Sequence, residues 1–186
     1  TAPNGAPQRY QAGRYIEATD YPNWEPLGTL MTPLYETAAT LRDDSAIHAE
    51  IERIRAQTES PRERAEAVLT LVQDRVRYVA LAMGEGGYVP ATADETWARR
   101  YGDCKAKTAL LLAMLRPLGI DAEPVLANID GRDGLPDLLP RVGQFNHVLV
   151  RATIDGRTYW FDGTRTGDRK LDTIETPPFR WGLPVL

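Results

Sequence analysis

The most constraining feature of this sequence is an almost uniformly apolar run from Ala106 to Leu115. A helix at a protein surface has one apolar stripe, whereas a helix that is apolar on all sides is buried. The run follows Asp103, is interrupted at Pro117 and is closed by Gly119, so it has the length of a core helix. The sequence therefore predicts a buried helix in the middle of the domain, with other elements wrapped around it.

Three longer helices are predicted before this run. Apolar residues at helical spacing predict the first two over residues 27 to 41 and 45 to 57. The third begins at Ser60–Glu63, which has the residues of a capping box with proline at the first helical position. Its apolar stripe predicts that this helix continues to about Met83.

Glycines at 84 to 87 are expected to end the third helix. This segment lacks the Lys and Ser/Thr of a phosphate-binding loop, so it is interpreted as a turn. A second capping box at Thr92–Glu95 predicts a short helix that ends before Gly102.

The chain changes character after the apolar run. Residues 121 to 129 and 145 to 154 have the composition of strands, and a loop rich in Gly, Pro and Asp separates them at 130 to 144. Asp155-Gly156 is a strong hairpin signal, and residues 157 to 162 supply the returning strand. Helices first and strands last predict an α+β domain.

One domain is expected for a chain of 186 residues. Residues 1 to 26 are interpreted as an extended lead-in, 27 to 164 as the main domain, and 165 to 186 as an irregular tail that packs on it. The start at Thr1 without a Met or a signal-peptide pattern, and the apolar end at Leu186, predict a fragment of a larger multidomain protein.

Composition excludes several functional classes. A net charge of −4 and a pI near 5.3 argue against a nucleic-acid partner, because phosphate binding depends on clustered Lys and Arg. No apolar run has the length that crosses a bilayer. One cysteine and two histidines form neither an intrachain disulfide nor an ordinary structural zinc site, so we expect no metal. We expect no nucleotide cofactor either.

Cys104, the only cysteine, lies at the start of the predicted buried helix. Free N–H groups and the helix dipole at this end favour a thiolate and can bind a developing oxyanion. The dipole contributes only about 1 kcal/mol, so an activated thiolate also needs a nearby imidazolium. The alternative is that Cys104 is a small buried hydrophobic residue, the commonest fate of a free cysteine.

His147 lies on the strand at 145 to 154, and its partner is predicted from the hairpin. A two-residue turn at Asp155-Gly156 places Asp162 opposite Leu149, which shares a face with His147. His147 and Asp162 are then diagonal neighbours within reach of a hydrogen bond. A loop of odd length would put them on opposite faces, and each alone could be a strand histidine or a turn aspartate.

Together these three residues have the roles that acyl transfer requires: Cys104 as nucleophile, His147 as base and Asp162 as the orienting acid. The backbone N–H of Cys104 would be one oxyanion donor. A second oxyanion donor is expected but is not identified by the sequence. Tyr78 and Trp97 are polar aromatic residues upstream, and each is better explained as a core residue. His48 and the Asp43-Asp44 pair are interpreted as solvated surface residues.

Three segments, 101–105, 145–148 and 160–164, resemble the motifs of bacterial transglutaminase-like proteins: Tyr-Gly-Asp-Cys-Lys, Phe-Asn-His-Val and Trp-Phe-Asp-Gly-Thr. Segments 76–78 and 84–88 resemble that family too. The resemblance covers residues 30 to 164 and is strongest to proteins in which this domain follows an N-terminal β-rich domain. It implies a papain-like α+β fold and assigns nucleophile, base and acid to Cys104, His147 and Asp162.

One departure is Ala106, where many relatives have an acidic residue. The class contains cross-linking transferases, proteases, amidases and inactive binding domains, so the resemblance implies thiol-dependent acyl transfer or hydrolysis on a peptide or amide without specifying the outcome. The alternatives are a non-catalytic peptide-binding or scaffolding module and a purely structural domain. Many bacterial members are exported, which is consistent with the periplasm or cell envelope. The loop at 130 to 144 is expected to form a wall or lid of the substrate cleft.

Overall fold

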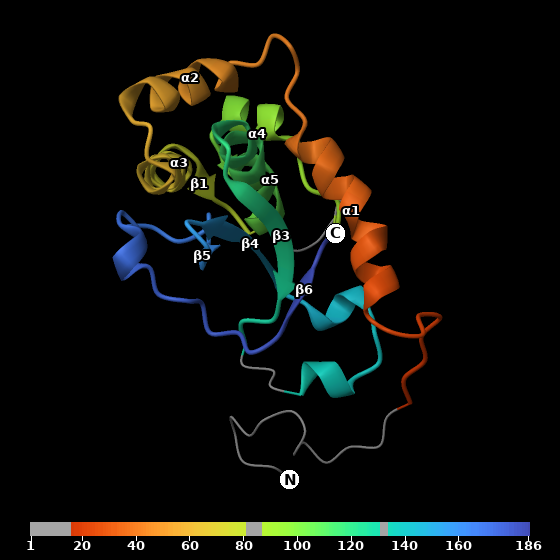
Figure 1. Cartoon of the computed structure of the whole chain (residues 1–186). Coiled ribbons are helices and arrows are strands. Elements are labelled where there is room, and N and C mark those ends of the chain that lie inside the picture. Colours follow the sequence, from red (N-terminus) through yellow and green to blue (C-terminus); the bar gives the residue numbers. More distant parts are fainter. Residues whose placement is uncertain (1–15, 81–86, 131–133) are drawn as a thin grey trace.

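The computed structural model describes residues 16–80, 87–130 and 134–186. Helices occupy the first part of the chain and an antiparallel sheet the second, which confirms the predicted α+β class (Figure 1). The helices are α1 (Glu25–Ala39), α2 (Ile47–Gln57), α3 (Pro61–Arg75), α4 (Ala93–Arg99) and α5 (Cys104–Leu115). The strands are β1 (Arg77–Tyr78), β2 (Tyr101–Gly102), β3 (Asp121–Ala127), β4 (His147–Ile154), β5 (Arg157–Phe161) and β6 (Gly182–Pro184).

The main sheet has the strand order β5-β4-β3-β6, and all its neighbours are antiparallel. Strands β4 and β5 are joined by Asp155 and Gly156, whose φ angles of 51° and 73° are those of a tight primed turn. Ile154 therefore pairs with Arg157, and Val150 pairs with Phe161. This register is the one that a two-residue turn predicts.

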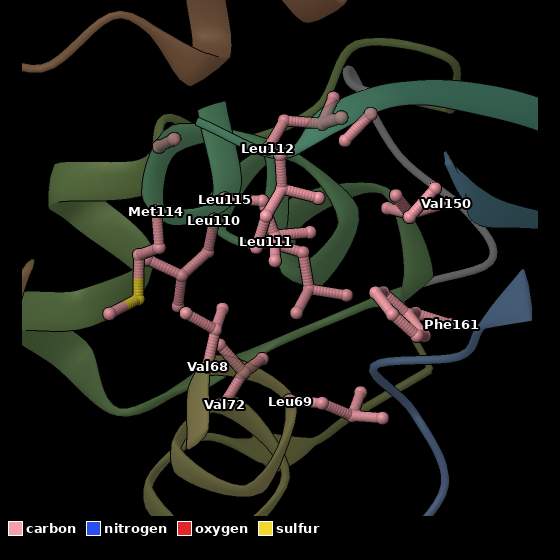
Figure 2. Close-up of a cluster of buried hydrophobic side chains, with 14 of the residues drawn as sticks. Val68, Leu69, Val72, Leu110, Leu111, Leu112, Met114, Leu115, Val150 and Phe161 are labelled. Carbon is pink, nitrogen blue, oxygen red and sulfur yellow. The ribbon is translucent and has the colours of Figure 1, made fainter. Parts of the chain in front are cut away.

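Helix α5 is the centre of the domain, with α1, α3 and α4 around it and the sheet against its remaining face (Figure 1). Every residue from Leu110 to Leu115 is buried, as its uniform hydrophobicity predicts. Figure 2 shows core side chains of α5 packed with those of α3 on one side and with Val150 and Phe161 of the sheet on another. Close packing around its body thus fixes helix α5, and with it the position of Cys104 at its first turn.

Helix α3 ends at Arg75, so the prediction that it continues to Met83 is wrong. Val76 adopts an extended conformation, and the next two residues form β1, which pairs in parallel with β2. The apolar spacing of this segment fits a helix, but its β-branched and aromatic residues also favour a strand, and pairing with β2 decides between them. The glycines at 84 to 86, predicted as a turn, lie outside the described residues.

The two predicted capping boxes differ in outcome. At α4 both halves are present: the Thr92 side chain accepts from the Glu95 N–H, and the Glu95 carboxylate accepts from the Thr92 N–H. At α3 only the Ser60 half forms, because the Glu63 carboxylate instead accepts a hydrogen bond from the Thr58 hydroxyl.

The C-terminal segment, predicted to be irregular, contains β6, which pairs with β3 and extends the sheet. The rings of Trp24, Phe145 and Trp181 cluster beside it, with centroid separations of 5.0 to 6.1 Å. The tail is therefore tied to the start of α1 and to the loop before β4. Within the described ranges, no helix combines the length and apolarity needed to span a membrane.

Candidate active site

The structure brings His147 and Asp162 together at one end of the hairpin. His147 is the first residue of β4, and Asp162 directly follows β5. Nε2 of His147 lies 2.9 Å from Oδ2 of Asp162, and both side chains are buried. The diagonal placement predicted from the turn is thus the one observed.

Asp162 is held by neighbours on both sides. Its Oδ1 accepts hydrogen bonds from the Thr164 N–H, at 2.9 Å, and from the Thr164 hydroxyl, at 2.6 Å. Its backbone carbonyl accepts from the Gln73 side chain at 3.0 Å. Burial favours the neutral acid, but the hydrogen bonds from His147 and Thr164 outweigh it and lower the pKa of Asp162.

Cys104 is the first residue of α5, where the Asp103 side chain caps the helix by accepting from the Ala106 N–H at 3.0 Å. Asp103 also pairs with Lys105, so its charge is compensated. Cys104 is partly buried and lies close enough to the His147 imidazole to raise its pKa. Because Nε2 of His147 is engaged by Asp162, Nδ1 is the ring nitrogen left for the thiol.

The pKa of His147 results from two opposing effects. Burial disfavours the imidazolium and by itself would lower the pKa. The hydrogen bonds and charges of Asp162 and Cys104 outweigh burial and raise the pKa of His147 from 6.5 to about 9. An imidazolium is therefore favoured beside the sulfur at neutral pH.

Close packing brings the segment that carries Cys104 against α4. A Cβ at Gly102 would lie 2.9 Å from the Cβ of Ala106 and 3.1 Å from Thr96 Cγ2. Only glycine allows this approach without a shift of the surrounding atoms. Ala106, the departure from many relatives, is itself buried in this contact region.

Two buried polar residues near the site are not predicted from the sequence. Gln73 of α3 donates to Asp162 O and to Asp168 Oδ2, and its own side-chain oxygen accepts from the Asp168 N–H. Lys107 of α5 is 1% exposed and donates to the Val76 carbonyl. Burial lowers the pKa of Lys107 to about 8, although the nearby Asp162 acts in the opposite direction. A lysine inside an apolar run is the one sequence signal for the second of these.

A pocket of about 570 Å³ opens beside Cys104 and His147. One wall is formed by Met31 and Tyr35 of α1, and Leu126 and Val148 of the sheet face the same space. Val142, Gly143 and Phe145 also line it, so the end of the predicted cleft loop forms part of the wall. Residues 131–133 of that loop lie outside the described residues.

The other residues singled out from the sequence are placed as follows. Tyr78 lines the pocket and is 43% exposed. Trp97 is buried, with the Arg100 guanidinium 3.6 Å from its ring centre, as expected of a core residue. His48 is on α2, where it hydrogen-bonds the Arg42 carbonyl away from the triad. No group of three potential metal ligands occurs among the residues that the structure describes.

The family model of the transglutaminase-like superfamily matches residues 49–162, which include all three residues of the candidate triad. The chain belongs to the transglutaminase-like superfamily. The matched region begins within α2 and ends at Asp162, so α1 and the C-terminal segment lie outside it.

Two solved structures resemble this transglutaminase-like chain. A candidate protease from Parabacteroides distasonis superposes with a TM-score of 0.57 at 16% identity, covering 76% of this chain and 27% of that one. A candidate cysteine protease from Cytophaga hutchinsonii gives 0.40 at 18% identity, covering 76% and 40% respectively. A search of curated proteins found no match. The chain thus spans well under half of either structure, and the first likeness supports the shared fold.

Proposed function

We propose that this transglutaminase-like domain catalyses thiol-dependent acyl transfer or hydrolysis on a peptide or amide substrate. The observation that carries the proposal is the position of the His147 imidazole between the Asp162 carboxylate and the Cys104 thiol. Cys104 and His147 line a pocket at the N-terminus of a buried helix, and Asp162 lies behind the imidazole. The description of the Parabacteroides distasonis protein as a candidate protease is in keeping with this chemistry.

At neutral pH the His147 imidazolium already holds the proton given up by the thiol, so in the first half-reaction Cys104 Sγ attacks the carbonyl carbon of the substrate as a thiolate. The tetrahedral intermediate collapses to a thioester as the C–N bond breaks, and the imidazolium gives its proton to the leaving amine. Asp162 fixes the ring tautomer and stabilises the charged imidazole throughout.

The start of α5 can stabilise the negative charge that develops on the carbonyl oxygen. N–H groups in the first turn of a helix have no carbonyl four residues earlier, so they remain available to an oxyanion. The Cys104 N–H is one such donor, directly beside the nucleophile. Tyr78, exposed at the same pocket, is the candidate for a second donor.

The second half-reaction releases the acyl group from Cys104. Water as the nucleophile completes hydrolysis, whereas an amine completes transfer, and in both cases His147 removes the proton of the incoming group. The thioester is common to the two outcomes, so its detection tests the proposal whichever acceptor resolves it.

Two measurements test this function. Iodoacetamide should alkylate Cys104 rapidly at pH 7, and His147→Ala should reduce the rate to that of an ordinary thiol, which reacts appreciably only above about pH 8. Incubation with p-nitrophenyl acetate or a peptide library should add an acyl group to wild type, detected by intact mass, and none to Cys104→Ala. Wild-type alkylation that matches free glutathione across the pH range, with no acyl adduct, would overturn the proposal and leave a non-catalytic binding module.

A further inference from the structure

Tyr35 carries a polar group that no other described residue engages. It lies in α1, outside the region that the family model matches. Its side chain is 0% exposed, and its hydroxyl finds no hydrogen-bond partner among the described residues. Burial of an unpaired hydroxyl costs stability, so such a group calls for a functional explanation.

The position of Tyr35 relates it to the candidate active site. It forms part of the wall of the pocket that holds Cys104 and His147. Burial first, then the nearby charges of Cys104 and Asp103, raise the pKa of Tyr35 well above its ordinary value. The phenol is therefore neutral at any physiological pH and retains its proton for donation.

The other polar groups of this pocket are already occupied or solvated. Asn146 is engaged at both ends of its amide, accepting from the Ile129 N–H and donating to Asp130. Lys105 is paired with Asp103. Met31, Leu126 and Val148 line the same pocket as Tyr35, and all three are apolar. The Tyr35 hydroxyl is thus an uncommitted hydrogen-bonding group in an apolar wall.

We propose that Tyr35 is a substrate-recognition residue, whose hydroxyl binds a neutral polar group on an otherwise apolar side chain of the acyl donor. The proposal rests on the thiol acyl-transfer function of the pocket. An apolar wall suits the body of such a side chain, and the hydroxyl suits its polar tip. A charged tip would be buried without a counter-ion, because Asp103 and Lys105 neutralise each other.

The size of the effect follows from the state of the hydroxyl before binding. Its side chain is 0% exposed in the free protein, so a substrate group reaches the hydroxyl only by displacing neighbouring pocket side chains, and the hydroxyl itself needs no further desolvation. A neutral hydrogen bond of this kind corresponds to about five- to tenfold in rate or affinity. A substrate that lacks the polar group leaves the hydroxyl as it is in the free protein.

Matched pairs of acyl donors test the proposal. N-acetyl-tyrosine and N-acetyl-phenylalanine p-nitrophenyl esters differ by one hydroxyl, and the corresponding threonine and valine esters form a shorter, nearly isosteric pair. Wild type should acylate Cys104 about five- to tenfold faster with the hydroxylated member of at least one pair. Tyr35→Phe should remove that preference, giving a coupling between the two hydroxyls in a double-mutant cycle.

Stability separates recognition from a structural role. Tyr35→Phe deletes an unpartnered hydroxyl and should keep or raise the unfolding temperature. The matched control is Tyr159→Phe, which removes a hydroxyl that accepts from Arg62. This control should lower the unfolding temperature and leave the ester preference unchanged.

The outcomes distinguish failure of this inference from failure of the function. Absence of any preference in both wild-type pairs, or a preference that survives Tyr35→Phe, overturns the role of Tyr35. Absence of acylation by every ester counts against the enzyme instead. In that case the N-acetyl amino-acid amides of the same pairs, titrated calorimetrically into Cys104→Ala, show whether the pocket prefers the hydroxylated member.

Discussion

His147 Nε2 lies 2.9 Å from Asp162 Oδ2, across a hairpin whose two strands are joined by only two residues. The contact occupies Nε2, leaves the opposite ring nitrogen for Cys104, and favours the charged imidazole. The relationship between these two residues therefore determines both the orientation and the protonation state of the proposed base.

Asp162→Asn tests this contact with almost no change of shape. Loss of the carboxylate charge should lower the pKa of His147 and slow Cys104 alkylation at pH 7 by about tenfold or more. The control is Asp172→Asn, which removes an exposed carboxylate paired with Arg62 and should not affect the rate. Equal alkylation rates in wild type and Asp162→Asn would show that Asp162 does not act through the imidazole.

The free energy of unfolding should depend on pH through the titration of His147. Its folded pKa, about 9, lies above the ordinary value of 6.5, so its stabilising contribution is complete below pH 6.5 and is lost as pH rises through 9. The whole contribution is on the order of 3 kcal/mol. Urea unfolding should show the free energy of unfolding decreasing from pH 6.5 to 8 in wild type. His147→Gln should be flat over this interval, and a flat wild-type curve would contradict the prediction.

Titration of Lys107 should change the free energy of unfolding in the direction opposite to that of His147, and at higher pH. Its pKa is lowered from 10.5 to about 8 in the folded protein, so its charge costs stability below pH 8 and the cost is relieved between pH 8 and 10.5. In wild type this gain should offset the remaining loss from His147 above pH 8. Lys107→Met removes the offset, and its free energy of unfolding should keep decreasing to about pH 9. Parallel curves for wild type and Lys107→Met would exclude this role.

Gln73→Leu should disturb Asp162 by removing the hydrogen bond to its backbone carbonyl. The substitution leaves the Asp168 N–H and the Asp162 carbonyl without their buried partner, which should destabilise the fold by about 1–3 kcal/mol. It should also slow Cys104 alkylation, because Asp162 loses an anchor. Asp74→Ala on the same helix breaks only a half-exposed ion pair with Arg169 and should cost under about 1 kcal/mol. If the Gln73→Leu protein loses stability but keeps the wild-type alkylation rate, then Gln73 stabilises the fold and does not act on Cys104 through Asp162.

Gly163→Ala probes the contact between the residue after Asp162 and helix α5. The new Cβ would lie 3.1 Å from Lys107 Cβ and 3.2 Å from Leu111 Cδ1, so the two elements must separate slightly. Overpacking of this kind costs about 1–3 kcal/mol. Gly134→Ala, with nothing within 4 Å, is the matched control and should be close to neutral. A neutral Gly163→Ala would show that α5 and the sheet are less tightly packed here than the structure indicates.

Local signals were sufficient for the parts of the molecule that depend on short-range rules. The buried helix α5 follows from hydrophobicity on all its sides, and the contact between His147 and Asp162 follows from a two-residue turn and strand alternation. The Cys104 position follows from the helix N-terminus. These features depend on residues close together in sequence or on a single hairpin register.

Long-range partners decide the rest. Helix α3 stops at Arg75 because β1 pairs with β2, a contact that no periodicity reveals. Strand β6 is three residues long and forms only because β3 has a free edge. Tyr35 and Gln73 carry no motif, and their relation to the active site appears only when α1 and α3 are packed around α5.

The Cys104 sulfur belongs to the central helix α5, and the His147 imidazole belongs to the sheet. The interface between the helix and the sheet is formed mainly by apolar side chains (Figure 2). Dispersion and hydrophobic contacts dominate this interface, a hydrogen bond from the Thr108 hydroxyl to the Val148 carbonyl crosses it, and no disulfide does, because the chain has one cysteine. Mild denaturant or heat that loosens this interface would therefore separate Cys104 from His147 while the helix and the sheet keep their secondary structure. The fast alkylation of Cys104 would then be lost before the circular dichroism changes, so that the reactivity of the thiol reports on the integrity of the interior more sensitively than spectroscopy does.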